Sequence, residues 1–291
     1  MSDFYKYHGL GNDYLVVDPA KFNLEVTAES VRLICDRNRG VGSDGILYGP
    51  LIDEDGSISV RIYNPDGSEA EKSGNGLRIF SRYLHEAGYV SSQDFEINTQ
   101  GGRVSVHLDS PDARLMTVSM GRLTFRSREI PVRGPEREVL EEPLEVNGRK
   151  LEISAASIGN PHCVVLCDRV DRNLAHQLGP LLERHPLFPR RTNVQFMEIL
   201  DRRNIKIEIW ERGAGYTLAS GSSSCAAAGV AYRLGRCDPE IQVHMPGGTL
   251  HVFLSPDFSV RMRGEVSAVF EGRFADEIRT RLVPGQGDRL H

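Results

Sequence analysis

Two serine-led turns, about half of the 291 residues apart, constrain this fold more than any other feature of the sequence. The first turn, 73–76, precedes apolar residues that recur at helical spacing until Gly88. The second turn, 220–224, precedes a helix of small residues that is expected over 225–234 and ends at Gly235. A serine N-cap followed by a periodic apolar stretch is typical of a helix start. The sequence therefore predicts the same turn and buried helix in both halves.

Strand-like segments surround both expected helices. They are rich in β-branched residues or alternate between apolar and polar residues. The expected strands are 14–17, 58–63, 95–98 and 104–108 in the first half, and 154–158, 163–167, 193–197 and 205–210 in the second. The charged, proline-bearing stretch 126–143 is predicted to connect two domains or to form a surface excursion. We therefore expect two similar domains that face each other across a cleft.

Composition and charge exclude several other classes of protein. A net charge of −5 gives no broad attraction for nucleic acid or anionic membranes, and 40% hydrophobic with 26% charged residues fits an ordinary soluble domain. The first residues lack the apolar segment of a signal peptide, and no apolar run is long enough to cross a membrane. Five cysteines without framework spacing indicate a reducing compartment, which predicts the cytoplasm. Cys163 and Cys167 are expected to pack in a core rather than to bind zinc.

The two serine-led turns predict a site for an anion. A glycine-rich turn at a helix start presents unpaired backbone N–H groups, and the helix dipole adds partial positive charge. Two such turns in one cleft could hold one carboxylate and present a side chain to each face of its α-carbon. Either turn alone is more often an ordinary capped helix, whereas the symmetric pair favours a site. Neither turn is a P-loop, because no Gly-Lys-Ser/Thr follows.

Several other polar residues have both a structural and a functional interpretation. Asparagines in loops, such as Asn12 and Asn160, are usually turn formers. Arg212 follows an expected strand, where it could bind a carboxylate with two hydrogen bonds or form a surface ion pair. His162, taken alone, is more often a packing histidine than a catalytic one. These residues acquire a functional meaning only when they are considered together.

Six segments, taken in their order along the chain, resemble the signature segments of the diaminopimelate epimerase family. They are His8-Gly9-Leu10-Gly11-Asn12-Asp13, Asn64-Pro65-Asp66-Gly67-Ser68-Glu69, Ser73-Gly74-Asn75-Gly76, Gly159-Asn160-Pro161-His162, Glu211-Arg212-Gly213-Ala214-Gly215 and Ala219-Ser220-Gly221-Ser222. The resemblance extends from about residue 4 to residue 272. Six ordered motifs are far more specific than any one of them.

The resemblance implies an α/β (α+β) fold with two pseudo-symmetric domains, each a β-barrel-like sheet around a central helix. Their expected bounds are 1–118, with 266–275 returning to it, and 119–265. It also implies a cytoplasmic epimerase that needs no metal, pyridoxal phosphate or other cofactor. The implied substrate is L,L- or meso-diaminopimelate, or a close analogue, on the route to lysine and peptidoglycan precursors. The partner would be this small amino acid, with no nucleic acid and no membrane, and the resemblance is compatible with a monomer or a homodimer.

The resemblance also assigns roles to individual residues. Gly74, Asn75, Gly221 and Ser222 match positions that bind the α-carboxylate. The rest of the substrate would be recognised by Asn12, Asn64, Asn160, Asn193, Glu211 and Arg212, and His162 matches a histidine near the catalytic pair. Ser73 and Ser220 occupy the two base positions, which are cysteines in the family. Gly45 and Tyr216 stand where many relatives have Gln and Glu.

The exchange of thiol for hydroxyl has a large energetic consequence. A thiol has a pKa of about 8.5, whereas the pKa of a serine hydroxyl is closer to that of water, about 15.7. A gap of roughly 5–7 units, at about 1.36 kcal/mol each, means that an oxyanion base costs roughly 7–9 kcal/mol more than a thiolate. The helix dipole stabilises an anion at the helix N-terminus by only about 0.3–2 kcal/mol, which offsets a small part of this cost. Cys225 cannot replace Ser220, because it is expected on another face of the helix.

Three hypotheses follow from this exchange. In the first, the chain is an epimerase whose serines are activated by neighbours such as His162 and Glu211. In the second, Glu211 or His162 moves the proton in an isomerisation or elimination, and the serines only orient the ligand. In the third, the chain binds an amino acid without catalysis.

Overall fold

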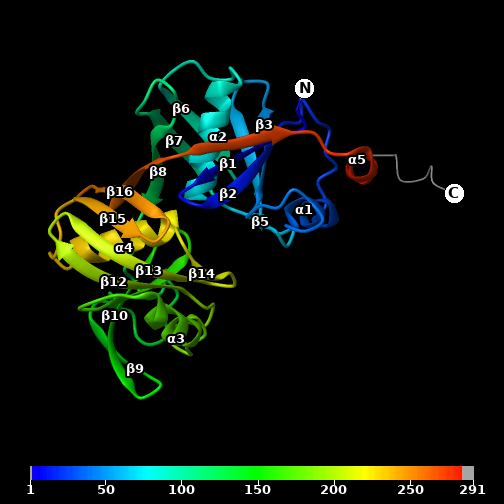
Figure 1. Ribbon diagram of the computed structural model, residues 1–291. Helices are drawn as coiled ribbons and strands as arrows, with labels where there is room; N and C mark the ends of the chain where they lie inside the picture. The colour runs from blue at the N-terminus through cyan, green and yellow to red at the C-terminus, as the bar shows by residue number, and fades with distance from the viewer. Residues whose placement is uncertain (1, 284–291) are drawn as a thin grey trace. The chain divides into compact units, whose positions relative to one another are not determined.

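The computed structural model describes residues 2–283, which form two compact units (Figure 1). Unit 1 contains the residues up to Val118 and returns from Glu265 onward, and unit 2 contains Ser119–Gly264. The chain therefore passes from one unit to the other twice.

Unit 1 consists mainly of strands with one long helix. Its elements are β1 (Phe4–Gly9), β2 (Asn12–Val17), α1 (Ala28–Cys35), β3 (Ile46–Ile52), β4 (Ile58–Tyr63), β5 (Glu69–Ala70), α2 (Gly74–Glu86), β6 (Asp94–Thr99), β7 (Gly102–Leu108), β8 (Leu115–Arg122), β18 (Ser267–Gly272) and α5 (Asp276–Leu282). The last residues of β8 already belong to unit 2.

Unit 2 has a closely similar set of elements. They are β9 (Glu142–Val146), β10 (Arg149–Ser157), β11 (Pro161–Leu166), α3 (Arg172–Glu183), β12 (Asn193–Asp201), β13 (Asn204–Glu211), β14 (Gly215–Thr217), α4 (Gly221–Arg233), β15 (Glu240–Met245), β16 (Gly248–Leu254) and β17 (Ser259–Glu265).

The strand pairings repeat from one unit to the other. In unit 1, β1 pairs antiparallel with β2, β2 parallel with β3, β3 antiparallel with β4, and β4 parallel with β6. In unit 2, β10, β11, β12, β13 and β15 pair in the same sequence of directions. Helices α2 and α4 occupy equivalent places in this order, between β5 and β6 and between β14 and β15. The strand–turn–helix repeat expected from the two serine-led turns is therefore confirmed.

The helix that follows each serine is buried within its own unit. Every residue of α2 from Gly74 to Leu84 is buried, and its polar side chains find backbone partners: Ser81 Oγ donates to the Leu77 carbonyl at 2.7 Å and Arg82 Nη1 to that of Val266 at 2.6 Å. Helix α4 is built from small residues, because its neighbours approach closely. A Cβ atom on Gly229 would collide with the Leu123 side chain.

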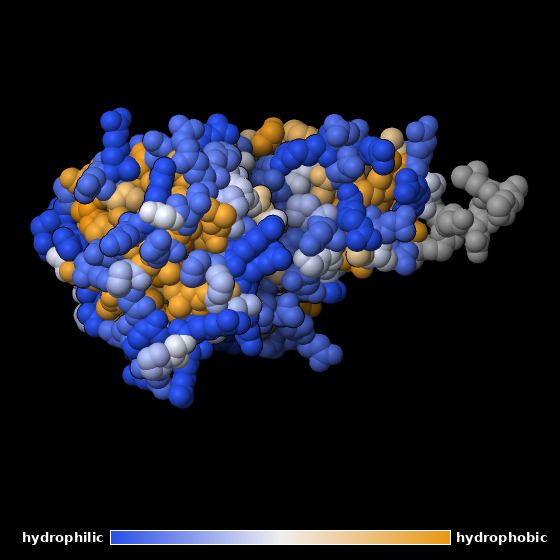
Figure 2. Space-filling model, turned by 90° about the horizontal axis from the view of Figure 1, so that it is seen from below, coloured by the Kyte–Doolittle hydropathy of each residue, from blue (hydrophilic) through white to orange (hydrophobic). Residues whose placement is uncertain are grey.

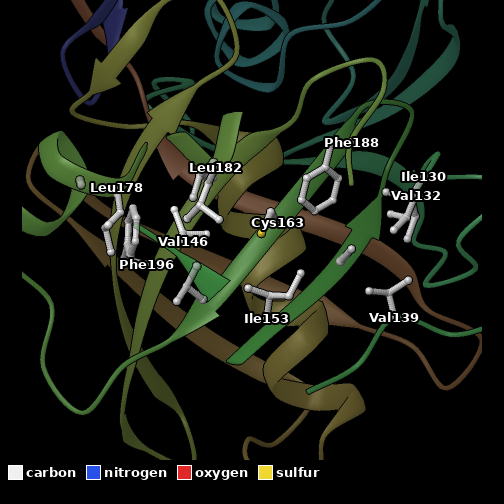
Figure 3. Packing of buried hydrophobic residues seen from close by; sticks show 14 of the residues in the cluster. Ile130, Val132, Val139, Val146, Ile153, Cys163, Leu178, Leu182, Phe188 and Phe196 are labelled. Carbon is white, nitrogen blue, oxygen red and sulfur yellow. The ribbon is translucent and has the colours of Figure 1, made fainter. Parts of the chain in front are cut away.

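The core of unit 2 lies between its sheet and α3 (Figure 3). Cys163 is completely buried in this cluster and Cys167 packs against it, as expected for core residues. Ile130, Val132 and Val139 also belong to this cluster. The stretch 126–143 lies within unit 2, so its interpretation as a connection between two domains is wrong. Most of its residues are exposed, as expected for a surface excursion, while three of its aliphatic side chains pack into the core of unit 2.

The eight expected strands and both central helices are present within a few residues of their predicted positions. The main difference is that α4 begins at Gly221, four residues before the expected start, because the serines after Gly221 are already helical. Hydrophilic residues are interspersed with hydrophobic patches on the face shown in Figure 2. Among residues 2–283, no helix is both long and apolar enough to span a membrane.

Candidate functional site

Each unit has a group of candidate site residues at the N-terminus of its buried helix. We call the group of Ser73, Gly74, Asn75 and the facing residues of β2 the unit 1 tip. The group of Ser220, Gly221, Ser222 and the facing residues of β11 is the unit 2 tip.

Ser73 is the N-cap residue of α2. Its backbone is extended, with φ −138° and ψ 118°, and its Oγ accepts a hydrogen bond from the Gly76 N–H at 3.0 Å. This bond satisfies one of the N–H groups that a helix start leaves unpaired. Ser73 is half-buried.

Asn75 connects the helix start to β2. Its Nδ2 donates to Asn12 Oδ1 at 3.0 Å, while its Oδ1 accepts from Arg78 Nη2 at 2.7 Å. Asn12 donates in turn to Asp44 Oδ2 at 2.9 Å. Arg78 is completely buried in the first turn of α2, so a guanidinium charge adds to the positive end of the helix dipole. The unit 1 tip is therefore well suited to an anion.

Tyr14 is a member of the unit 1 tip that sequence reasoning missed. Its hydroxyl lies 3.2 Å from Ser73 Oγ, and either oxygen can donate. The ring packs where Gly45 has no side chain: a Cβ atom there would lie 2.6 Å from Tyr14 Cε1 and 2.5 Å from the Tyr63 carbonyl oxygen. The strand-like residues 14–17 predict a strand at this position, but not the contact of the Tyr14 hydroxyl with the N-cap of α2.

Ser220 differs from Ser73 in its hydrogen bonding. It is the N-cap residue of α4, with φ −147° and ψ 126°, but its side chain makes no capping hydrogen bond. Ser224 instead bonds back to the Ser220 carbonyl, through its N–H at 3.1 Å and its Oγ at 2.8 Å. The N–H groups of the first turn are thus left without a capping oxygen from Ser220, which is the arrangement that binds anions at helix starts.

His162 is held as a neutral ring in the unit 2 tip. It is completely buried, and burial lowers its pKa to about 3, with the charge of Arg212 acting in the same direction. Its Nε2 lies 3.0 Å from Asn160 Oδ1, which can only accept, so Nε2 carries the proton. Asn160 Nδ2 donates to Ser222 Oγ at 3.4 Å. The imidazole therefore orients Asn160 toward the helix start.

Asn193 supports the loop after β13. Its Nδ2 donates to the Pro161 carbonyl at 3.0 Å and its Oδ1 accepts from the Arg212 N–H at 2.9 Å. Both ends of the amide are therefore used within the protein. Arg212 itself is exposed, with Nη1 donating to the Arg190 carbonyl at 3.1 Å, and Glu211 Oε2 accepts from Thr217 Oγ1 at 3.2 Å.

Other expected site residues lie further from the serines in the hydrogen-bond network. Asn64 follows β4 and donates to Ser68 Oγ at 3.0 Å, within its own turn. Tyr216 donates to Glu208 Oε2 at 2.7 Å. Cys225 is completely buried in α4. Within the described part of the chain, no group of three His, Cys, Asp or Glu residues is arranged to hold a metal ion.

Comparison with known proteins agrees with this architecture. A solved structure of a hydroxyproline epimerase from Agrobacterium vitis, with bound trans-4-hydroxy-L-proline, superimposes with a TM-score of 0.68 over 92% of this chain and 90% of that one, at 14% identity. The chain thus has the two-unit α/β fold of that epimerase. The family model for diaminopimelate epimerase matches residues 4–126 and 154–269. The chain belongs to the diaminopimelate epimerase family.

Two relatives show how close this membership is. A protein named diaminopimelate epimerase 2 from Nostoc sp. is 52% identical over 275 residues, which cover 94% of this chain and 96% of that protein. A protein named diaminopimelate epimerase from Stutzerimonas stutzeri is 40% identical over 272 residues, which cover 93% of this chain and 98% of that protein. The resemblance found in the sequence motifs is confirmed.

Proposed function

We propose that this chain is a cofactor-independent epimerase of L,L- and meso-diaminopimelate, on the route to lysine and peptidoglycan precursors. The observation that carries the proposal is the repeat itself: each unit places a serine at the N-cap of a buried helix whose first turn suits a carboxylate. Membership of the family and the relatives' names support the substrate class.

The chemistry divides between carboxylate binding and proton transfer. Backbone N–H groups at Gly74, Asn75, Gly221 and Ser222 bind the α-carboxylate, whose negative charge is favoured at the positive ends of the helix dipoles. Neutralising this carboxylate makes the neighbouring C–H more acidic, because less charge accumulates when the proton leaves. Ser73 and Ser220 are the groups that remove and return the α-proton.

The remaining polar residues recognise the distal part of the substrate. Arg212 offers a planar guanidinium, which suits a second carboxylate, and Glu211 offers a negative charge for an ammonium group. Asn12, Asn64, Asn160 and Asn193 complete this set. Asn193 contributes by fixing the backbone of Arg212, since its own amide is fully used. His162 contributes by orienting Asn160 rather than by moving a proton, because its ring is neutral and buried.

Solvent exchange tests this proposal directly. The protein is incubated with L,L- or meso-diaminopimelate in heavy water, and deuterium at the α-carbon and the stereoisomer ratio are followed by NMR and chiral chromatography. Exchange with interconversion of the two isomers is expected, and the Ser73→Ala, Ser220→Ala double variant should abolish both. Binding without exchange would refute the proposal in favour of an amino-acid binding protein. Activity on a different carboxylate alone would indicate another proton-transfer reaction.

We also propose that the chain acts in the cytoplasm as a homodimer. All five cysteines are free thiols, which supports a reducing compartment. Val269 and Phe270 of β18 are about half exposed, at 50% and 48%, which supports self-association through this strand. Light scattering after size-exclusion chromatography should give twice the mass of 32.4 kDa, and Phe270→Lys should shift it toward one chain.

A further inference from the structure

We propose that Tyr14 is a proton relay for Ser73, and that its phenol supplies the basicity that a serine hydroxyl lacks. This inference rests on the proposed function. It concerns the unit 1 tip, where the two hydroxyl oxygens lie 3.2 Å apart. Tyr14 acts through Ser73 and is therefore a positioning residue rather than a catalytic one.

The hydrogen bonds at Ser73 leave the right atoms available for a relay. Ser73 Oγ already accepts from the Gly76 N–H at 3.0 Å, which fixes the oxygen at the helix start. The hydroxyl proton of Ser73 is then free to point to the Tyr14 oxygen. Tyr14 is 7% exposed, so bulk water competes little for its hydroxyl.

Gly45 holds the Tyr14 ring in this position. A Cβ atom on residue 45 would lie 2.6 Å from Tyr14 Cε1 and 3.0 Å from Tyr14 Cδ1, so any side chain there would displace the ring. Tyr14 and Gly45 each come directly before one residue of a pair, because Leu15 of β2 pairs with Ile46 of β3. The absence of a side chain at residue 45 is thus what permits the hydroxyl contact with Ser73.

The internal repeat gives independent support for this position. Asn12 and Tyr14 lie at the start of β2, and Asn160 and His162 lie just before and within the start of β11, with the same spacing between the two residues. The strand pairing agrees, because Leu15 pairs with Ile46 as Cys163 pairs with Val194. Both units therefore place a titratable ring at the same point of the repeat. The Tyr14 hydroxyl contacts the serine of its unit, whereas His162 Nε2 bonds to Asn160.

The proton balance of the relay is simple. In the active form Tyr14 is a phenolate and Ser73 is a neutral hydroxyl. As the α-carbon gives its proton to Ser73 Oγ, the original Ser73 proton moves to the Tyr14 oxygen, so that a carbanion and two neutral hydroxyls result. The reverse steps return a proton to the carbon. Since a phenol has a pKa of about 10 and a serine hydroxyl about 15.7, the phenol forms the required anion far more readily.

The test measures α-deuterium exchange between pH 7 and 10 in the wild type and in four variants. These are Tyr14→Phe, Tyr89→Phe, Ser73→Cys and the double variant Tyr14→Phe, Ser73→Cys. Tyr14→Phe should lower the rate about a hundredfold or more, within the range of general acid–base catalysis, and should flatten the rise of rate with pH. Tyr89→Phe is the matched control, because it removes a hydroxyl that donates to Asp18 at 2.8 Å, beyond the far end of α2. Its rate should be unchanged.

Rescue by a thiol separates a relay from a packing effect. A thiol ionises without help from a phenol, so Tyr14→Phe should cost less than about fivefold when it is combined with Ser73→Cys. A full rate in Tyr14→Phe, or an equal loss in both backgrounds, would overturn the relay.

A spectroscopic measurement keeps the inference testable if the proposed function fails. Ultraviolet difference titration near 295 nm, wild type against Tyr14→Phe, isolates the ionisation of the Tyr14 phenol. Ser73→Ala should shift this ionisation if the two hydroxyls are hydrogen bonded. An unshifted titration would refute the pairing, whether or not the protein exchanges α-protons.

Discussion

The buried His162 makes a testable prediction about how acid destabilises unit 2. Its pKa is lowered from 6.5 to about 3, chiefly because burial disfavours the charged ring. Between these pH values the unfolded chain binds a proton at this residue and the folded chain does not. The stability that depends on neutral His162 is therefore complete above about pH 6.5 and is lost progressively as the pH falls.

The size of the effect follows from the same values. Each pH unit well below 6.5 is worth about 1.36 kcal/mol, so lowering the pH from 6.5 to 4.5 should reduce the free energy of unfolding by about 2 kcal/mol through this residue. Paired carboxylates also lose their charge in this pH range, so the contribution of His162 must be measured against a variant that lacks this residue. His162→Gln keeps an N–H donor for Asn160 but has no group that titrates there.

Urea unfolding between pH 4.5 and 7.5 measures this difference. The chain has a single tryptophan, Trp210 in β13, which packs against the unit 2 core and donates to Glu183 Oε2 at 2.9 Å. Its fluorescence therefore reports the unfolding of unit 2 rather than of unit 1. The two stability curves should diverge toward acid, with the wild type losing more. Parallel curves, or an NMR titration of His162 near pH 6.5, would refute the reasoning.

Three further predictions concern the tips. The Ser73→Cys, Ser220→Cys double variant should raise the rate of α-deuterium exchange at least about a hundredfold, because a thiol ionises about 7 pH units below a hydroxyl; an unchanged rate would mean that the bases do not limit the reaction. Gly45→Ala should reduce the free energy of unfolding in urea by about 1–3 kcal/mol, because the added Cβ meets the Tyr14 ring and the Tyr63 carbonyl, and unaltered stability would contradict this packing. Asn193→Ala should raise KM more than it lowers kcat in steady-state assays, because the Arg212 N–H loses its acceptor; an unaltered KM would argue against a role for Arg212 in binding.

Much of the fold could be predicted because local patterns agree with tertiary packing. The segments around Ile58–Tyr63 and Gly74–Glu86 combine strong periodicity with a clear turn or cap, and both elements are present. The burial of Ile130, Val132 and Val139 in the unit 2 core could not be predicted, because the charged residues of 126–143 outnumber its apolar residues. These three residues lie outside the regular helices and strands, so their burial depends on contacts that are distant in sequence.

The candidate site could be predicted only where it depends on local sequence patterns. Ser73 and Ser220 were found because an N-cap is a local signal, and both residues are N-caps. The contact of Tyr14 with Ser73 was missed because it joins residues from β2 and α2 that are far apart in sequence. The neutral state of His162 was missed too, since it depends on complete burial rather than on neighbouring residues in the sequence.

The residue at position 45 gives the sharpest test of how the unit 1 tip differs from its relatives. The resemblance of the sequence motifs to the diaminopimelate epimerase family implies Gln in many relatives where this chain has Gly45, and a thiol where it has Ser73. If Gly45 is needed to admit the Tyr14 ring, and the ring is needed only because residue 73 is a hydroxyl, the two positions are coupled. Gly45→Gln should then abolish most α-deuterium exchange in the wild-type background, and should cost much less in Ser73→Cys. Equal losses in both backgrounds would mean that Gly45 serves packing alone, because neighbouring sites that act independently give additive effects.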